Sequence, residues 1–221
     1  MPEKLTVILF SNQKQTVEII AQTLQGSGFY LGGITDSFEN TRTLLSQYAP
    51  EFLIINLDTN CRETNTLVNR LKSVSPRTKI IVTGNHCDNE ILFNAVKAGA
   101  DVFLSDSMDP SDLLDILQTL MEDGVYLPAY IAESLLEKSQ KENQSPTEFP
   151  LILTAREQSI LSEFSTGANL VSVAGNLGIP PELVKAHTTN ILQKIHFVYI
   201  AQKQYEEIMS GLSNFRSSFE Y

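Results

Sequence analysis

Five polar side chains stand at the ends of apolar runs in this chain, where they could do binding chemistry. They are Ser11, Asn12, Asn56, Thr83 and Asp106. Hydroxyl, amide and carboxylate groups can hold a small ligand, or they can hydrogen-bond one another. Residue type alone leaves both roles open, so the elements that position these groups come next.

The apolar runs predict the strands of a parallel β-sheet. Four are continuous and the last is weaker, at residues 5–10, 52–56, 79–83, 101–105 and 30–35. Continuous apolar runs are typical of parallel strands that are covered on both faces. Segments with helical spacing separate the runs, so the pattern predicts a five-stranded, doubly wound α/β sheet. Ligands bind such sheets beyond the carboxyl ends of the strands, where the five polar residues stand.

Composition excludes several classes of protein. The chain has 221 residues, of which 42% are hydrophobic and 19% charged, as in a globular protein with room for two domains. No apolar run approaches the roughly 18 residues needed to cross a membrane, and the first residues do not form a signal peptide. The two cysteines have no paired spacing, which excludes a disulfide framework and a zinc site. We therefore expect a cytoplasmic protein without a cofactor.

A polar stretch divides the chain. Residues 134–150 run into Ser-Pro and Phe-Pro, which is the composition of a linker. We expect a first domain with a trailing helix at 1–135, a linker at 136–150 and a second domain at 151–221. The net charge of −10 belongs mostly to the first part, because residues 149–221 carry 5 Lys/Arg and 6 Asp/Glu. Such a near-neutral domain lacks the basic surface that supplies most DNA affinity.

The second domain has the pattern of a helix-turn-helix. Thr154 and Glu157 have the spacing of a capping box at the start of a helix. A short helix, a turn at "LGIPP" and a helix from Pro181 to about Ile195 follow. A last helix is expected at 199–211. The pattern therefore predicts a smaller, all-α domain of four helices.

The stretch "LTAREQSILSEFSTGANLVSVAGNLGIPPELVKAHTTNILQKI" resembles, without a gap, the LuxR-type helix-turn-helix at the C-terminus of NarL/FixJ response regulators. "GVYLPAYIAESLLEKS" and "KAGADVFLSD" resemble the trailing helix and the fifth strand of that family's receiver domain. The resemblance implies a transcription regulator, not an enzyme, that binds double-stranded DNA as a homodimer. It implies that Lys185 and Thr189 contact base edges of the DNA, and that Asn190 and Lys194 contact its phosphate or sugar groups. His187 also matches the motif, although a lone histidine there often packs or caps.

The same resemblance implies a degenerate receiver, a pseudo-receiver that works without phosphorylation. A receiver takes a phosphoryl group on one of its own aspartates. It holds Mg²⁺ on carboxylates that include an acidic pair, and one of its lysines contacts the phosphate. In this chain, Asn56 stands at the phosphoacceptor position. Ser11 and Asn12 stand at the positions of the acidic pair, and Asp106 stands at the position of the lysine. An amide cannot form the acyl phosphate, and neutral side chains give Mg²⁺ little reason to shed water. We therefore expect no metal.

Five further residues have two interpretations. Thr83 and Phe103 match the switch pair of receivers, or they are a buried strand end and a core aromatic. Asp58, two residues after the phosphoacceptor position, is a substitute acceptor or a solvated loop carboxylate. Cys61 and Cys87 follow neighbouring strands of a receiver-like sheet, so they are a possible redox pair or two unreactive thiols.

A second function remains open from the sequence. The chain could be an adaptor that uses the same fold, binds DNA weakly or not at all, and acts on another regulator or on RNA polymerase. The near-neutral charge of residues 149–221 favours the adaptor, whereas Lys185, Asn190 and Lys194 favour DNA. The aromatic tail beyond residue 204 either packs on the domain or contacts a partner.

Overall fold

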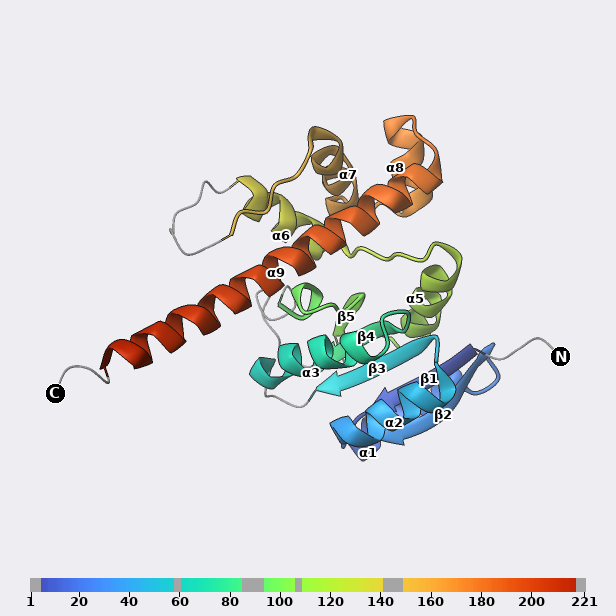
Figure 1. Ribbon diagram of the computed structural model, residues 1–221. Coiled ribbons are helices and arrows are strands. Elements are labelled where there is room, and N and C mark those ends of the chain that lie inside the picture. The colour runs from blue at the N-terminus through green and yellow to red at the C-terminus, as the bar shows by residue number, and fades with distance from the viewer. Residues whose placement is uncertain (1–4, 58–60, 85–93, 106–108, 141–148, 218–221) are drawn as a thin grey trace.

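The computed structural model describes residues 5–57, 61–84, 94–105, 109–140 and 149–217. They form a sheet with helices on both faces, followed by a helical part from which one long helix projects (Figure 1). None of the helices in these ranges is both long and apolar enough to pass through a lipid bilayer.

The sheet has five parallel strands in the order β2-β1-β3-β4-β5. The strands are β1 (Leu5–Phe10), β2 (Phe29–Thr35), β3 (Phe52–Leu57), β4 (Lys79–Gly84) and β5 (Val102–Ser105). Every predicted run forms a strand whose bounds differ from the expected ones by at most one residue. The predicted doubly wound sheet is confirmed.

Helices cover both faces of this sheet. One face packs against α1 (Lys14–Leu24) and α5 (Pro110–Glu122), and the other against α2 (Phe38–Tyr48) and α3 (Cys61–Val74). Side chains alternate along each strand, so Ile54 joins the first cluster and Ile55 the second. Both residues are fully buried, which explains why the strand runs are apolar throughout.

The helical part has its own apolar core. It is built from α6 (Ala129–Gln140), α7 (Ala155–Ser165), α8 (Leu170–Leu177) and α9 (Pro181–Ser217). The predicted capping box is present, because Thr154 and Glu157 each accept a hydrogen bond from the other's backbone N–H. Helix α8 ends at Gly178, whose φ of 62° lies in the left-handed region that favours glycine. The chain then turns directly into α9.

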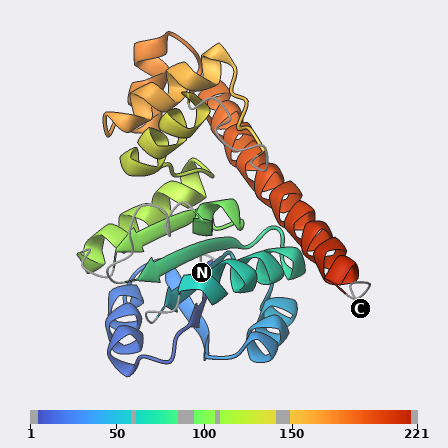
Figure 2. The same ribbon diagram turned by 90° about the vertical axis from the view of Figure 1, so that its left-hand side faces the viewer.

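The boundary expected between the last two helices is wrong, because 181–195 and 199–211 belong to one continuous helix, α9. The intervening residues, His-Phe-Val, contain no glycine or proline, so nothing ends the helix there. The fourth helix of the helical core, among the described residues, is instead α6, which packs against α7 and runs to Gln140. Figure 2 shows α9 extending well past the other helices.

In Figure 1, helix α9 lies between the sheet domain and α6 to α8, and Figure 2 shows it running along one side of the molecule. Hydrogen bonds between described residues join the two parts and the segment that links them. His196 Nδ1 bonds the backbone oxygen of Lys97 at 2.8 Å, and Tyr130 Oη of α6 donates to the backbone oxygen of Phe103 at 2.8 Å. Lys79 Nζ donates to the backbone oxygen of Gly124, between α5 and α6, at 2.9 Å.

Candidate functional site

Three of the polar residues predicted at strand ends form one buried, hydrogen-bonded row. Ser11 Oγ donates to Asn56 Oδ1 at 3.1 Å, and Asn56 Nδ2 donates to Thr83 Oγ1 at 3.0 Å. These residues are only 4%, 3% and 8% exposed. Strands β1, β3 and β4 are adjacent, so their carboxyl ends bring the three side chains together. We call Ser11, Asn56 and Thr83 the crevice row.

The crevice row consists of neutral groups that satisfy one another. A buried polar group is stable when it has a hydrogen-bond partner, and here the amide has one on each side. Within the described ranges, no three His, Cys, Asp or Glu side chains are grouped to hold a metal ion. Asn12 is exposed beside the row, whereas Asp58, Cys87 and Asp106 lie outside the described residues. The roles expected for those three residues, and the redox pair with Cys61, stay predictions.

Phe103 occupies a core position in β5. Its side chain is 2% exposed and belongs to the cluster beneath α2 and α3. Its backbone oxygen accepts the hydrogen bond from Tyr130, and burial of that phenol, with a smaller contribution from Tyr126, raises the pKa of Tyr130. The residue predicted as half of a switch pair therefore holds α6 against the sheet through its main chain.

The first part of α9, which is the second helix of the helix-turn-helix and is called the recognition helix below, carries one buried stripe of side chains. The side chains of this stripe are at most 1% exposed: Val184, Thr188, Ile191 and Ile195. The hydroxyl of Thr188 donates to the backbone oxygen of Val184 at 2.9 Å, so the polar member of the stripe is satisfied. The other side of the helix carries Lys185, Thr189 and Asn190, which are exposed.

Part of this exposed side faces the sheet domain. Thr189 and Gln193 line a cavity of about 240 Å³ together with Lys79 and Asp101. The side-chain nitrogen of Lys185 lies so close to Gly124 that a Cβ there would be 2.9 Å from it. A cavity of about 240 Å³ has no room for a DNA duplex, whose major groove alone is about 12 Å wide. In this arrangement of the two parts, the sheet domain therefore keeps a duplex away from this side of α9.

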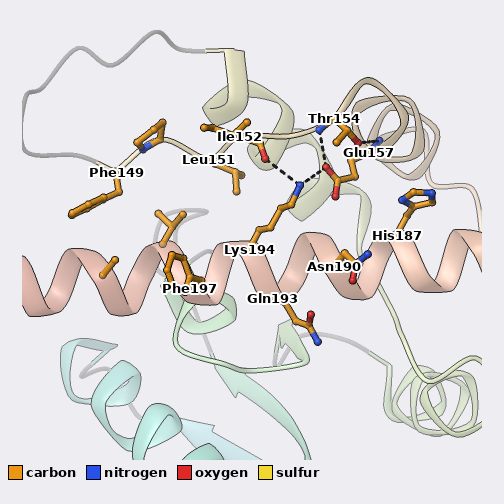
Figure 3. Close-up of a pocket in the computed structure, with 13 residues that line it drawn as sticks. Phe149, Leu151, Ile152, Thr154, Glu157, His187, Asn190, Gln193, Lys194 and Phe197 are labelled. Atoms are coloured by element: carbon orange, nitrogen blue, oxygen red, sulfur yellow. Dashed lines mark hydrogen bonds and ion pairs between the residues drawn. The ribbon is translucent and has the colours of Figure 1, made fainter.

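Lys194 is engaged inside the helical domain. Its Nζ bonds Glu157 Oε2 at 2.7 Å and the backbone oxygen of Ile152 at 3.3 Å (Figure 3). Burial raises the pKa of Glu157, but hydrogen bonds from Lys194 and Thr154 outweigh it and hold that pKa below its usual range. Lys194 thus neutralises the buried carboxylate that caps α7, which is a structural role that the sequence did not predict.

A second charge cluster stands at the amino ends of β4 and β5. Asp101 bonds Lys72 Nζ at 2.7 Å and Lys79 Nζ at 3.1 Å, and its side chain is 15% exposed. Asp101 also accepts from the backbone N–H of Ile80 at 2.9 Å. Lys79 reaches on to Gly124, so the cluster ties the edge of the sheet to the segment that leads into α6. Sequence reasoning missed this cluster, since its members are far apart along the chain.

An apolar groove runs beside the start of the helical domain, and no sequence pattern predicted it. Its volume is about 730 Å³, and Phe149, Ile152 and Phe197 form much of its wall (Figure 3). Ile152 and Phe197 are 74% and 72% exposed. His187 and Asn190, predicted for DNA, line its polar end. The sequence does show apolar residues at the end of the expected linker, such as Phe149 and Ile152, and these were the signal that could have indicated the groove.

Comparisons with known proteins agree with this two-part organisation. Residues 151–201 match the family of bacterial regulatory proteins named luxR. A nitrate/nitrite response regulator protein homolog of Haemophilus influenzae is 25% identical over 198 residues, covering 89% of this chain and 92% of that protein. The oxygen regulatory protein NreC of Staphylococcus epidermidis is 24% identical, covering 84% of this chain and 82% of that protein.

Solved structures show the same fold. The RcsB response regulator of Salmonella typhimurium matches with a TM-score of 0.52 and 19% identity, covering 87% of this chain and 92% of that one. The RcsB–DNA complex matches with a TM-score of 0.53 and 18% identity, covering 92% of this chain and 99% of that one. The chain is thus similar over most of its length to response regulators, it has a receiver-like fold followed by a helical domain, and its residues 151–201 match the luxR family of bacterial regulatory proteins.

Proposed function

We propose that this protein is a cytoplasmic, DNA-binding transcription regulator whose receiver domain works without phosphorylation. It binds double-stranded DNA through α8 and α9 and acts as a homodimer. The observation that carries the proposal is the crevice row. A neutral amide, hydrogen-bonded on both sides and 3% exposed, stands where a receiver needs a reactive carboxylate.

The input to such a receiver acts without covalent chemistry. A ligand or a partner protein that binds the crevice competes for the hydrogen bonds of the row. The output is the separation of α9 from the receiver, because Thr189 lines the cavity between the two parts. A signal that favours the separated state therefore makes the recognition helix available, and DNA itself favours that state by binding it alone.

The DNA contacts fall to the exposed side of α9. Lys185 and Thr189 take the base edges and Asn190 takes the backbone. His187 is half-buried, and it contributes chiefly by packing beside the groove. Lys194 supports the domain from within, because its ammonium is already bonded to Glu157. This leaves few cations for phosphate contacts and predicts a weak dependence of affinity on salt.

Two measurements test the proposal. Acetyl phosphate with Mg²⁺ should leave no acid-labile phosphate on the protein, and its appearance would contradict phosphorylation independence. Genome-wide crosslinking should recover discrete DNA sites with a common sequence, and the recovered sequence should bind the purified chain more tightly than random DNA.

An adaptor function is the second candidate, favoured by the near-neutral charge of residues 149–221 together with the internal engagement of Lys194. As an adaptor, the chain would act on another regulator or on RNA polymerase. In that case crosslinking recovers the DNA sites of the partner, and the purified chain alone binds those sites no more tightly than random DNA. The two candidates are thus separated by the same experiment.

A further inference from the structure

The cavity between the sheet domain and α9 is lined from both sides. The sheet domain contributes Lys72, Lys79 and Asp101, and α9 contributes Thr189 and Gln193. Its volume of about 240 Å³ corresponds to roughly eight water molecules at about 30 Å³ each, so a guest with about that many non-hydrogen atoms fits. Pockets for larger ligands measure about 300–1,000 Å³, so this cavity suits a small metabolite.

The charged side chains of the cavity do not balance. The ammonium groups of Lys72 and Lys79 face Asp101, which is the only carboxylate among the described residues that line the cavity. Two positive charges against one negative charge leave a positive surplus, in a chain whose net charge is −10. Lys185 adds to this surplus from the rim, because its Nζ stands beside Gly124. A partly buried charge without a counter-ion is costly, so the cavity favours an anion.

Both ammonium groups keep a hydrogen-bond donor for such an anion. A lysine has three N–H donors. Lys72 Nζ directs one to Asp101 and one to the backbone oxygen of Thr78. Lys79 Nζ directs one to Asp101 and one to the backbone oxygen of Gly124. Within the described part of the chain, each lysine therefore has one N–H left, and two such donors match the two oxygens of a carboxylate.

Neutral donors complete the polar lining. Helix α9 provides the hydroxyl of Thr189 and the amide of Gln193, and Tyr126 provides a phenol. Burial, and to a lesser extent the charge of Asp112, raises the pKa of Tyr126, so the phenol keeps its proton and can donate it. An anion that bonds the lysines and these α9 groups touches both parts of the molecule.

The rest of the lining is largely apolar. Val96, Leu120 and Val125 line the cavity from the sheet domain and the segment after α5, and Leu192 lines it from α9. The first three are at most 6% exposed. An inorganic ion would leave these side chains uncovered, whereas a hydrocarbon group in the same place is removed from water. The lining therefore fits one carboxylate attached to a compact apolar body.

We propose that this cavity binds a small organic acid, and that the bound acid holds α9 against the sheet domain. The carboxylate accepts hydrogen bonds from Lys72 and Lys79, and Gln193 of α9 donates to the same guest. Once the two parts separate, half of the lining is gone, so the acid binds only the closed arrangement and shifts the equilibrium toward it. The consequence for DNA rests on the proposed function: the acid opposes DNA binding by α9.

An NMR titration of the full-length chain without DNA tests the site with benzoate, which has one carboxylate and a compact apolar body. Benzoate should bind with a Kd below about 1 mM, and the amide signals of both Ile80 and Gln193 should shift. Benzamide has nearly the same shape without the charge and should bind at least about tenfold more weakly. Inorganic phosphate, which lacks the apolar body, should also bind more weakly than benzoate.

Three outcomes of this titration would overturn the site. They are a chain that shows no shifts with benzoate up to about 10 mM, equal binding of benzoate and benzamide, and phosphate that binds more tightly than benzoate. Shifts confined to one of the two parts would refute the bridging of α9 and the sheet domain. Since no DNA is present, these results stand apart from the proposed function.

Variants locate the site. Lys79→Gln should weaken benzoate binding at least about tenfold, because it removes a charged donor. Lys14→Gln makes the same change at a side chain that is 91% exposed on α1, and it should leave the Kd unchanged. Gln193→Leu alters an exposed residue of α9 and should weaken binding at least about threefold, which decides the matter even if Lys79→Gln is unstable. Equal effects of the two lysine variants, or an unchanged Kd in Gln193→Leu, would refute the site.

A second titration connects the site with DNA. Saturating benzoate should weaken the binding of the wild-type chain to its specific DNA, and DNA should weaken benzoate binding by the same factor. Lys79→Gln should lose this effect of benzoate. A chain that binds benzoate and DNA independently would refute the closing role of the acid. A chain that binds benzoate but no DNA contradicts the proposed function and supports the site.

Discussion

Replacing Lys194 by methionine should destabilise the helical domain by about 2 kcal/mol, because it leaves a buried carboxylate without its cation. The Glu157 side chain is 4% exposed and its Oε2 lies 2.7 Å from Lys194 Nζ. Breaking a buried ion pair by removing one partner costs about 3–5 kcal/mol. Solvent screens this pair, since Lys194 is 39% exposed, and the Thr154 N–H still bonds the carboxylate. Both effects reduce the expected cost to about 2 kcal/mol.

The loss should depend on pH in a defined direction. The folded-state pKa of Glu157 is held below its usual range, so its charge stabilises the fold above the ordinary carboxyl pKa. That stabilisation disappears as the pH falls through the folded pKa. In Lys194→Met the burial remains while the cation is gone, so the pKa of Glu157 rises. The stability difference between the two proteins should therefore be largest near neutral pH and shrink below about pH 4.

Urea unfolding followed by circular dichroism, at pH 7 and at pH 3.5, measures both effects. Lys203→Met serves as the control, because it removes an equal charge from the same helix away from Glu157. A cost below about 0.5 kcal/mol at pH 7, or a cost independent of pH, would refute the structural role of Lys194. If Lys194→Met instead lowered the affinity for all DNA sequences equally and left the stability unchanged, the result would support the phosphate contact expected from the sequence.

Three further predictions concern the crevice row and the recognition helix. Asn56→Asp should still form no acid-labile phosphate with acetyl phosphate and Mg²⁺, because Ser11 and Asn12 supply no carboxylate for the metal; mass spectrometry that finds one would contradict this. Thr83→Val removes an acceptor of the Asn56 amide and should lower the free energy of unfolding by about 1–2 kcal/mol in urea titrations, and no change would mean that the row adds nothing to stability. Lys185→Ala should cost about 1–3 kcal/mol on the specific site and less on random DNA, and an equal loss on both in binding titrations would exclude a base contact.

The sheet could be predicted from sequence because each strand encodes its own burial. Ile54 and Ile55 face opposite helical layers, so a run that is apolar at every position already specifies a strand covered on both sides. The crevice row follows from the same logic, since parallel strands end at one edge and Asn56 pairs in register with Thr83. The local apolar pattern and the common direction of the strands were therefore sufficient to predict the sheet and the crevice row.

The remaining contacts depend on tertiary packing that no local pattern encodes. Lys194 and Glu157 are 37 positions apart, and Lys72 and Asp101 are 29 apart, so neither pair has a local signature. The continuity of α9 was missed although residues 196–198 contain no glycine or proline, so nothing in the local sequence separates the two segments that were expected as two helices. The groove was missed because Phe149 lies in the expected linker and Ile152 only two residues beyond its end, where no periodic pattern indicates a surface.

Strand β4 connects the two ends of the receiver mechanically. Thr83, near its carboxyl end, bonds Asn56 in the crevice, and Lys79, its first residue, bonds Gly124 and lines the cavity beside Thr189. Strand β4 is paired with a strand on each side and packed on both faces, so it is a rigid element of the sheet. The roughly 13 Å between these residues are therefore spanned by a single paired strand, which joins the crevice row to the cavity beside Thr189 without an intervening loop.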